Sequence, residues 1–97
     1  MTTLHIVRKS AFNTSDFVQC LQVTEKNDVV VFIDDGCYNL CHDLITKIEQ
    51  DKSVQLKVIE AHASARGVTI NDDICTKISM NELVSLTFTN DRVITWQ

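Results

Sequence analysis

The sequence of 97 residues contains no proline and only two glycines, and its aromatic content is 6%. Linkers are usually rich in one of these two residues, so we expect a single ordered domain over residues 1–97. With two glycines, a Gly-x-Gly-x-x-Gly nucleotide loop is excluded. No apolar run approaches the roughly 18 residues of a membrane span, and the first residues carry no long apolar segment typical of secretion. These absences predict a cytoplasmic protein that does not enter a membrane.

Positive charge is also scarce. Nine Lys and Arg residues stand against 13 Asp and Glu residues, which gives a formal net charge of −4, and the two signs are spread evenly along the chain. Proteins that bind nucleic acid directly need clustered Lys and Arg to neutralise phosphates. The sequence therefore predicts no direct contact with nucleic acid.

The most informative segment that is present is the apolar run Val29–Ile33, which is followed by Asp34, Asp35, Gly36 and Cys37. A wholly apolar and mostly β-branched run is typical of a strand that is buried on both faces, as in a parallel sheet covered by helices. The carboxyl ends of such strands are where open α/β sheets bind ligands. Cys37 is therefore expected at a place where a thiol could react.

Strands and helices are expected to alternate along the chain. Apolar runs predict strands, and apolar residues spaced three or four apart predict helices. The predicted strands are Leu4–Val7, Asp28–Ile33, Ser53–Ile59, Ile74–Ile78 and Arg92–Trp96, and the predicted helices are Asp16–Glu25, Tyr38–Gln50 and one that begins near Met80. This order predicts a three-layer, flavodoxin-like α/β fold with a mostly parallel sheet of four or five strands.

Local signals add detail to three of these elements. The helix Tyr38–Gln50 is expected to bury a stripe that includes Cys41. Ser79 and Glu82 have the spacing of a capping box at the start of the last helix. The short passage Glu60–Arg66 is expected to end at Gly67 in the left-handed conformation.

A set of residues along nearly the whole chain resembles one family. These residues are Leu4-His5, Ser10, Asp16-Phe17, Cys20-Leu21, Asp35-Gly36, Ala65-Arg66-Gly67, the Leu83-to-Thr87 helix and Trp96. Their order and spacing resemble the TusB/DsrH family of small sulfur-relay proteins. The resemblance implies a subunit that joins TusC-like and TusD-like sister subunits in a heterohexamer.

Two pathways follow from this resemblance. In the TusBCD branch, the complex passes persulfide sulfur to a downstream sulfur-carrier protein, toward 2-thiolation of the wobble uridine of tRNA. In the DsrEFH branch, the related complex serves sulfur oxidation. The resemblance implies a mainly structural role for this subunit, because the principal sulfur-accepting cysteine belongs to the TusD or DsrE partner.

Cys20 is the first candidate persulfide carrier. It lies where DsrH-like proteins carry a cysteine on their first helix. Its alternative role is packing, because it shares a helix face with Phe17 and Leu21 and free cysteine is among the most buried residue types.

Cys37 is the second candidate. A helix N-terminus lowers the pKa of a thiol and favours the reactive thiolate. The adjacent carboxylates of Asp34 and Asp35 oppose that effect. Cys37 is therefore either a reactive thiol or a packing group.

Metal binding and independent redox chemistry are weaker alternatives. Cys37, Cys41, His42, His62 and Cys75 could suggest zinc, but the Cys-x-x-Cys and His-x-x-x-His spacings are absent. We therefore predict no metal and no cofactor. An interaction module whose four thiols are all structural is the main rival to a sulfur carrier.

Overall fold

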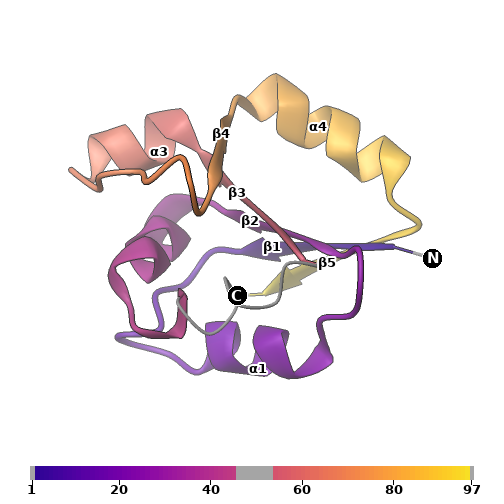
Figure 1. Ribbon diagram of the computed structural model, residues 1–97, viewed down its shortest axis with the longest axis horizontal. Coiled ribbons are helices and arrows are strands. Elements are labelled where there is room, and N and C mark those ends of the chain that lie inside the picture. The colour runs from indigo at the N-terminus through magenta and orange to yellow at the C-terminus, as the bar shows by residue number, and fades with distance from the viewer. Residues whose placement is uncertain (1, 46–53, 97) are drawn as a thin grey trace.

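A computed structural model describes residues 2–45 and 54–96 of the chain (Figure 1). Its elements follow one another as strands that alternate with helices. They are β1 (Thr3–Val7), α1 (Asp16–Val23), β2 (Val29–Phe32), the 3₁₀ helix η1 (Asp34–Cys41), β3 (Gln55–Ile59), α3 (Glu60–Ala65), β4 (Thr76–Ile78), α4 (Met80–Thr89) and β5 (Arg92–Trp96). None of the helices among these residues is long and apolar enough to cross a membrane.

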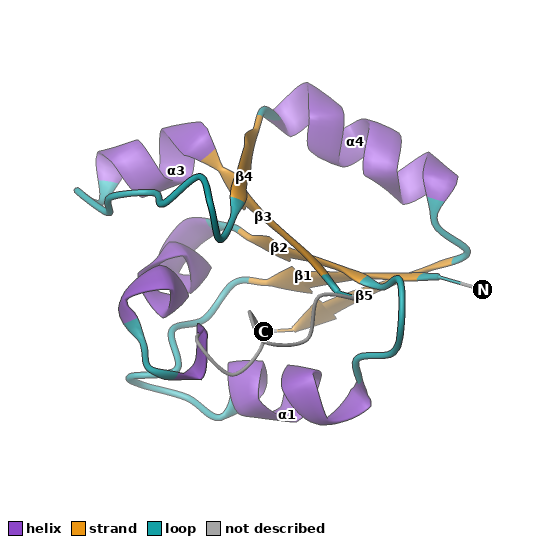
Figure 2. Cartoon of the chain, viewed as in Figure 1, coloured by secondary structure: helices purple, strands orange, loops and turns teal. Residues whose placement is uncertain are grey.

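The five strands form one sheet in the order β4-β3-β2-β1-β5, and every neighbouring pair is parallel (Figure 2). β2 occupies the centre of the sheet, and all four of its residues are buried. A central parallel strand has helices over both faces, which explains why its sequence does not alternate. The predicted three-layer, flavodoxin-like α/β fold is confirmed.

Two apolar layers lie on opposite faces of the sheet. On one face α1, η1 and α3 cover a cluster that includes Val7, Phe17 and Phe32. On the other face Leu83 of α4 packs against a second cluster that includes Leu4 and Val31. Figure 1 shows α1 and α4 on opposite sides of the strands. Among the described helices, α4 is the one that packs on this second face.

Most boundaries agree with the sequence prediction. β5 has the predicted limits, and α1 begins at Asp16 as predicted but ends two residues early. The capping box of α4 is present, because Ser79 Oγ accepts a hydrogen bond from the Glu82 amide at 3.2 Å. Gly67 has φ +67°, which confirms the left-handed end of α3.

The predicted helix Tyr38–Gln50 is wrong in its first part. Residues 34–41 form the 3₁₀ helix η1, and Cys41 is exposed rather than part of a buried stripe. The buried side chain of Asn39 explains the change, because its Oδ1 accepts from the Ala11 amide at 2.7 Å and its Nδ2 donates to the Lys9 carbonyl at 3.1 Å. These bonds tie the segment to the loop after β1. Residues 46–50 of the predicted helix lie outside the described residues.

Candidate functional site

Cys20 lies on the face of α1 that packs against the sheet. Its side chain is fully buried in the core cluster with Phe17. Burial, and to a lesser degree the negative charge of Asp28, raises the pKa of its thiol to about 12. Because the thiolate is the nucleophile in sulfur exchange, burial makes Cys20 a poor nucleophile in this conformation.

Cys37 is the fourth residue of η1 and is also fully buried. Burial raises the pKa of its thiol to about 11, and the charges of Asp34 and Asp35 add to this while Arg66 opposes it. The thiol donates a long hydrogen bond of 3.9 Å to the Phe32 carbonyl. The opposing effect predicted for the two aspartates is therefore present, and Cys37 is held as a neutral thiol.

The other two cysteines differ sharply from one another. Cys75 is buried, and its pKa is raised to about 12, chiefly by desolvation. Cys41 is exposed at the end of η1, and all four cysteines are free. Cys41 is therefore the accessible thiol of the described chain, although the sequence pattern placed it in the core.

Thiol labelling will distinguish these environments. In native protein at pH 7.4, Ellman's reagent will react quickly with one thiol per chain, Cys41, and with Cys20, Cys37 and Cys75 only as the chain unfolds. At a pKa of 11 to 12, roughly one thiol in a thousand or fewer is ionised at this pH. The Cys41→Ser variant will lose the fast phase. Fast labelling of Cys20 in the native state would contradict the burial described above.

A buried polar chain crosses the sheet beside α1. The Trp96 indole donates from Nε1 to His5 Nδ1 at 3.2 Å, and His5 Nε2 lies 3.0 Å from Asp28 Oδ2. An indole N–H can only donate, so Nδ1 accepts and Nε2 carries the hydrogen that bonds to Asp28. His5 is 1% exposed. His5 is therefore a buried, hydrogen-bonded structural group, and the Trp96 ring packs against its own domain.

Asp28 anchors this chain at the start of β2. Its carboxylate also accepts from the Thr3 amide and the Glu25 amide, both at 3.0 Å. Burial alone would raise the pKa of Asp28, but the hydrogen bonds from Glu25, His5 and Thr3 lower it below its usual value. Sequence reasoning missed Asp28 because its three donors come from separate segments.

Charged side chains gather at the carboxyl ends of β1, β2 and β3. Arg8 Nε lies 3.1 Å from Asp34 Oδ2, and His62 Nδ1 accepts from the Asp34 amide at 3.1 Å. Arg66 Nε lies 3.0 Å from Asp35 Oδ1. Asp34 has φ +48°, a left-handed conformation that is uncommon outside glycine. The cluster lies close enough to Cys37 for its charges to act on the thiol.

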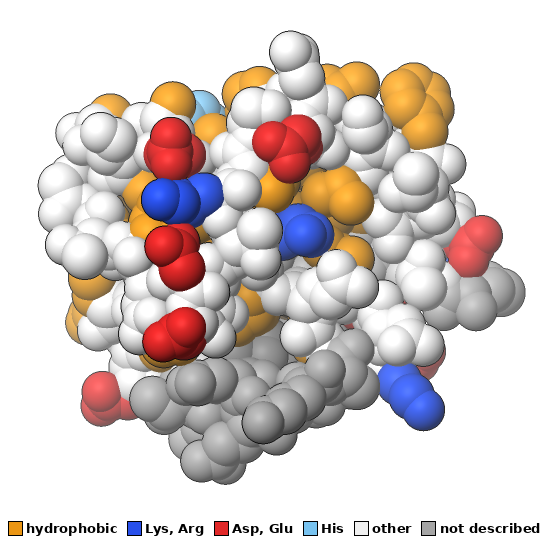
Figure 3. Space-filling model, turned by 45° about the horizontal axis from the view of Figure 1, so that its top comes forward, with side chains coloured by type: hydrophobic (Ala, Val, Ile, Leu, Met, Phe, Trp, Pro, Cys, Tyr) orange, Lys and Arg blue, Asp and Glu red, His pale blue; other side chains and the backbone are white. Residues whose placement is uncertain are grey.

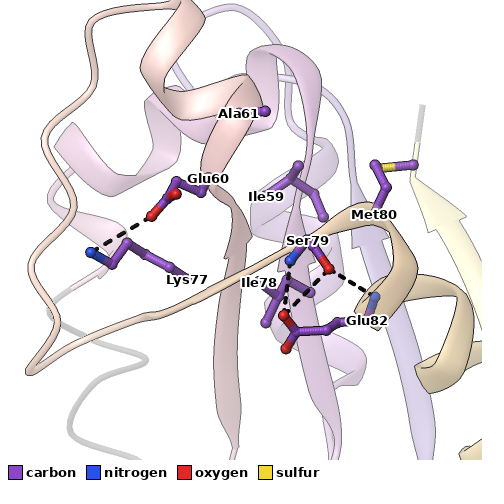
Figure 4. Close-up of a pocket in the computed structure, with 8 residues that line it drawn as sticks. All are labelled: Ile59, Glu60, Ala61, Lys77, Ile78, Ser79, Met80 and Glu82. Atoms are coloured by element: carbon purple, nitrogen blue, oxygen red, sulfur yellow. Dashed lines mark hydrogen bonds and ion pairs between the residues drawn. The ribbon is translucent and has the colours of Figure 1, made fainter.

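An open pocket of about 320 Å³ lies between the ends of β3 and β4 (Figure 4). The connection after β3 leads to α3, on the same face of the sheet as α1, whereas the connection after β4 leads to α4 on the opposite face. The pocket lies where these two connections diverge. Ser79 and Glu82 bond to one another in the capping box, and Glu60 pairs with Lys77 at 3.6 Å. The polar groups at its rim are thus already partnered, and the remaining lining is Ile59, Ala61, Ile78 and Met80.

No group of three or more His, Cys, Asp or Glu side chains within residues 2–45 and 54–96 is arranged to hold a metal ion. Among the residues that could suggest zinc, Cys37 and Cys75 belong to one core cluster. Cys37 and Cys75 are buried, whereas Cys41 is exposed.

The parallel sheet with helices on both faces defines a small three-layer α/β protein, in which three of the four thiols are buried. A solved structure with the same architecture is described as "Crystal structure of ychN protein from E.coli"; it has 21% identity, covers 98% of this chain and 99% of that chain, and gives a TM-score of 0.65. A search of curated proteins finds no match. The family model described as "DsrH like protein" matches residues 9–93. The chain therefore belongs to the DsrH-like family, and this membership supports a role in sulfur relay.

Proposed function

We propose that this chain is a cytoplasmic subunit of a TusBCD-like sulfurtransferase complex, in which its main role is assembly. The complex would pass persulfide sulfur to a downstream carrier protein, toward 2-thiolation of the tRNA wobble uridine. Its partners would be TusC-like and TusD-like sister subunits in a heterohexamer. Membership of the DsrH-like family supports the relay role.

The observation that carries the assembly role is the burial of three thiols. Cys20, Cys37 and Cys75 are each at most 1% exposed, and the pKa of each is raised to about 11 or 12. A sulfur carrier needs an accessible thiolate. The two thiols that sequence analysis favoured as carriers are therefore poor acceptors in this conformation.

The outer face of α4 supports association with a partner. Met80, Val84 and Phe88 recur every four residues, and Phe88 is 84% exposed. Figure 3 shows hydrophobic side chains along the upper edge of this face, over α4. Because Leu83 packs on the sheet from the other side, the helix is apolar toward both the core and solvent.

Sulfur transfer itself follows a defined exchange. The acceptor thiolate attacks the outer sulfur of a donor persulfide, a new S–S bond forms, and the donor leaves as a thiolate. Cys41 is the thiol placed for this exchange in the chain alone. Cys20 or Cys37 would need α1 or η1 to move first, since each packs in the core.

Intact-mass spectrometry tests the proposal. Wild type and the Cys20→Ser, Cys37→Ser and Cys41→Ser variants are exposed to a persulfide donor, with and without TusC-like and TusD-like subunits. We expect a gain of one sulfur, about 32 Da, on the TusD-like subunit, and no adduct on Cys20 or Cys37. Any adduct on this chain alone will disappear in Cys41→Ser.

Four results would change the assignment. Loss of a wild-type adduct in Cys20→Ser would make this chain a carrier rather than an assembly subunit. Failure to co-purify with either sister subunit would remove the assembly role. Transfer from the complex to a sulfur-oxidation partner, and not to a tRNA-thiolation carrier, would favour the DsrH-like alternative. Oxidation or metal uptake by the isolated chain would favour a stand-alone thiol-redox or metal-binding protein.

A further inference from the structure

Within residues 2–45 and 54–96, β5 is an edge strand, and its second hydrogen-bonding side has no partner strand. Among the described strands it pairs only with β1, through all five of its residues. The Arg92 amide donates to the Thr2 carbonyl, and the Trp96 carbonyl accepts from the Arg8 amide. Backbone groups alternate in direction along a strand, so residues 92, 94 and 96 bond to β1, and the N–H and C=O groups of Val93 and Thr95 point to the open edge.

This edge has few of the features that usually protect one. It is five residues long, contains no proline and has Arg92 as its one charged side chain, and Val93 and Ile94 are 43% and 37% exposed. The other edge strand, β4, has only three residues and presents the charged Lys77. Exposed apolar edge strands are templates for pairing with another strand.

We propose that β5 pairs antiparallel with β5 of a second copy of this chain, with Ile94 on the two-fold axis. In this register Val93 faces Thr95 of the second copy, so the two outward-pointing residues exchange N–H and C=O bonds on both sides of the axis. Ile94 faces Ile94, and all five strand residues of each copy are paired. The product is a continuous ten-stranded sheet across two chains.

The side chains match in the same register. Arg92 stands opposite Trp96 of the second copy, twice, on the face of the sheet that carries α1. The Trp96 ring is already fixed by its hydrogen bond and its stacking on His5, with ring centroids 6.3 Å apart. A guanidinium beside an indole gains a cation–π contact. The sequence Arg92-Val93-Ile94-Thr95-Trp96 is thus complementary to itself when antiparallel, which is the argument for a second copy over another partner.

Disulfide trapping tests the register. In a Cys41→Ser background, which removes the exposed thiol, Ile94→Cys places two thiols opposite each other on the axis. Mild oxidation should give a linked dimer of twice the 11.0 kDa chain. The matched control is Val93→Cys, whose thiol faces Thr95 and lies two residues from its own counterpart, so it should not crosslink. No crosslink with Ile94→Cys, or equal crosslinking of both variants, would overturn the proposal.

Sedimentation equilibrium tests the dimer without a crosslink. Val93→Pro removes an outward N–H that does not bond to β1, so the monomer should keep its fold while the dimer is lost. Arg92→Glu should weaken the dimer about tenfold or more, because both cation–π contacts are removed. Lys26→Glu makes the same charge change at an exposed site away from β5 and should leave the dimer intact. A monomeric wild type, or a folded Val93→Pro variant that still dimerises, would refute the proposal.

Discussion

Replacing Gly36 with alanine will lower the free energy of unfolding by about 3 kcal/mol. A Cβ at this position would lie 2.0 Å from the Val7 carbonyl oxygen and 2.8 Å from its carbon. Both atoms are backbone in the central sheet, so neither can rotate away. The Val7 carbonyl also accepts from the Ile33 amide at 3.0 Å, and the displacement would break this bond. Urea denaturation followed by circular dichroism measures the loss.

The second glycine supplies the control. At Gly67 a Cβ would meet nothing within 4 Å, but φ is +67°. Gly67→Ala should therefore cost only about 1 kcal/mol, which is the usual penalty for a left-handed alanine. Equal losses of unfolding free energy in the two variants would show that the close approach of Val7 is not the reason that position 36 needs glycine.

Removing the carboxylate of Asp28 will lower the free energy of unfolding by about 3–4 kcal/mol at pH 7. Asp28→Ala leaves the Thr3 amide, the Glu25 amide and the His5 ring without their acceptor in a buried site. Asp28→Asn keeps one acceptor oxygen and should lose about half as much. Urea titrations of the three proteins test the order.

The stabilisation that the Asp28 carboxylate gives to the fold will decrease as the pH falls. Its pKa is lower in the folded state than in the unfolded chain, so the charged form stabilises the fold above the ordinary pKa of about 4. This contribution is lost as pH falls through the lower, folded-state pKa. The difference between wild type and Asp28→Asn should therefore be constant from pH 5 to 7 and shrink below about pH 4. A difference that grows on acidification would contradict the stabilising role of the carboxylate.

The strands and their common direction could be predicted because burial on both faces leaves a simple pattern. The run Val29–Ile33 and the alternating segment Arg92–Trp96 both became strands close to their expected limits. The capping box at Ser79 and the left-handed Gly67 were also predictable, because each depends on residues within a few positions of itself.

The site was less predictable because its contacts are distant in sequence. Asn39 bonds to the loop after β1 across 28 and 30 positions, and that bonding favours a 3₁₀ helix where the periodicity predicts a regular one. This is why Cys41 faces solvent while Cys37 is buried. The spacing of apolar residues predicts which face of a helix is buried, but it does not show hydrogen bonds to a distant loop that change the type of helix.

The pairing of β1 with β5 has a consequence for synthesis. The Thr2 amide bonds to the Asp91 carboxylate across 89 positions, and Trp96 bonds to His5 across 91. Until the ribosome has released residues 92–96, β1 can pair only with β2 and is itself an exposed edge. The nascent chain would therefore present the backbone of β1 to other chains until β5 emerges, and a chaperone would matter most in that interval.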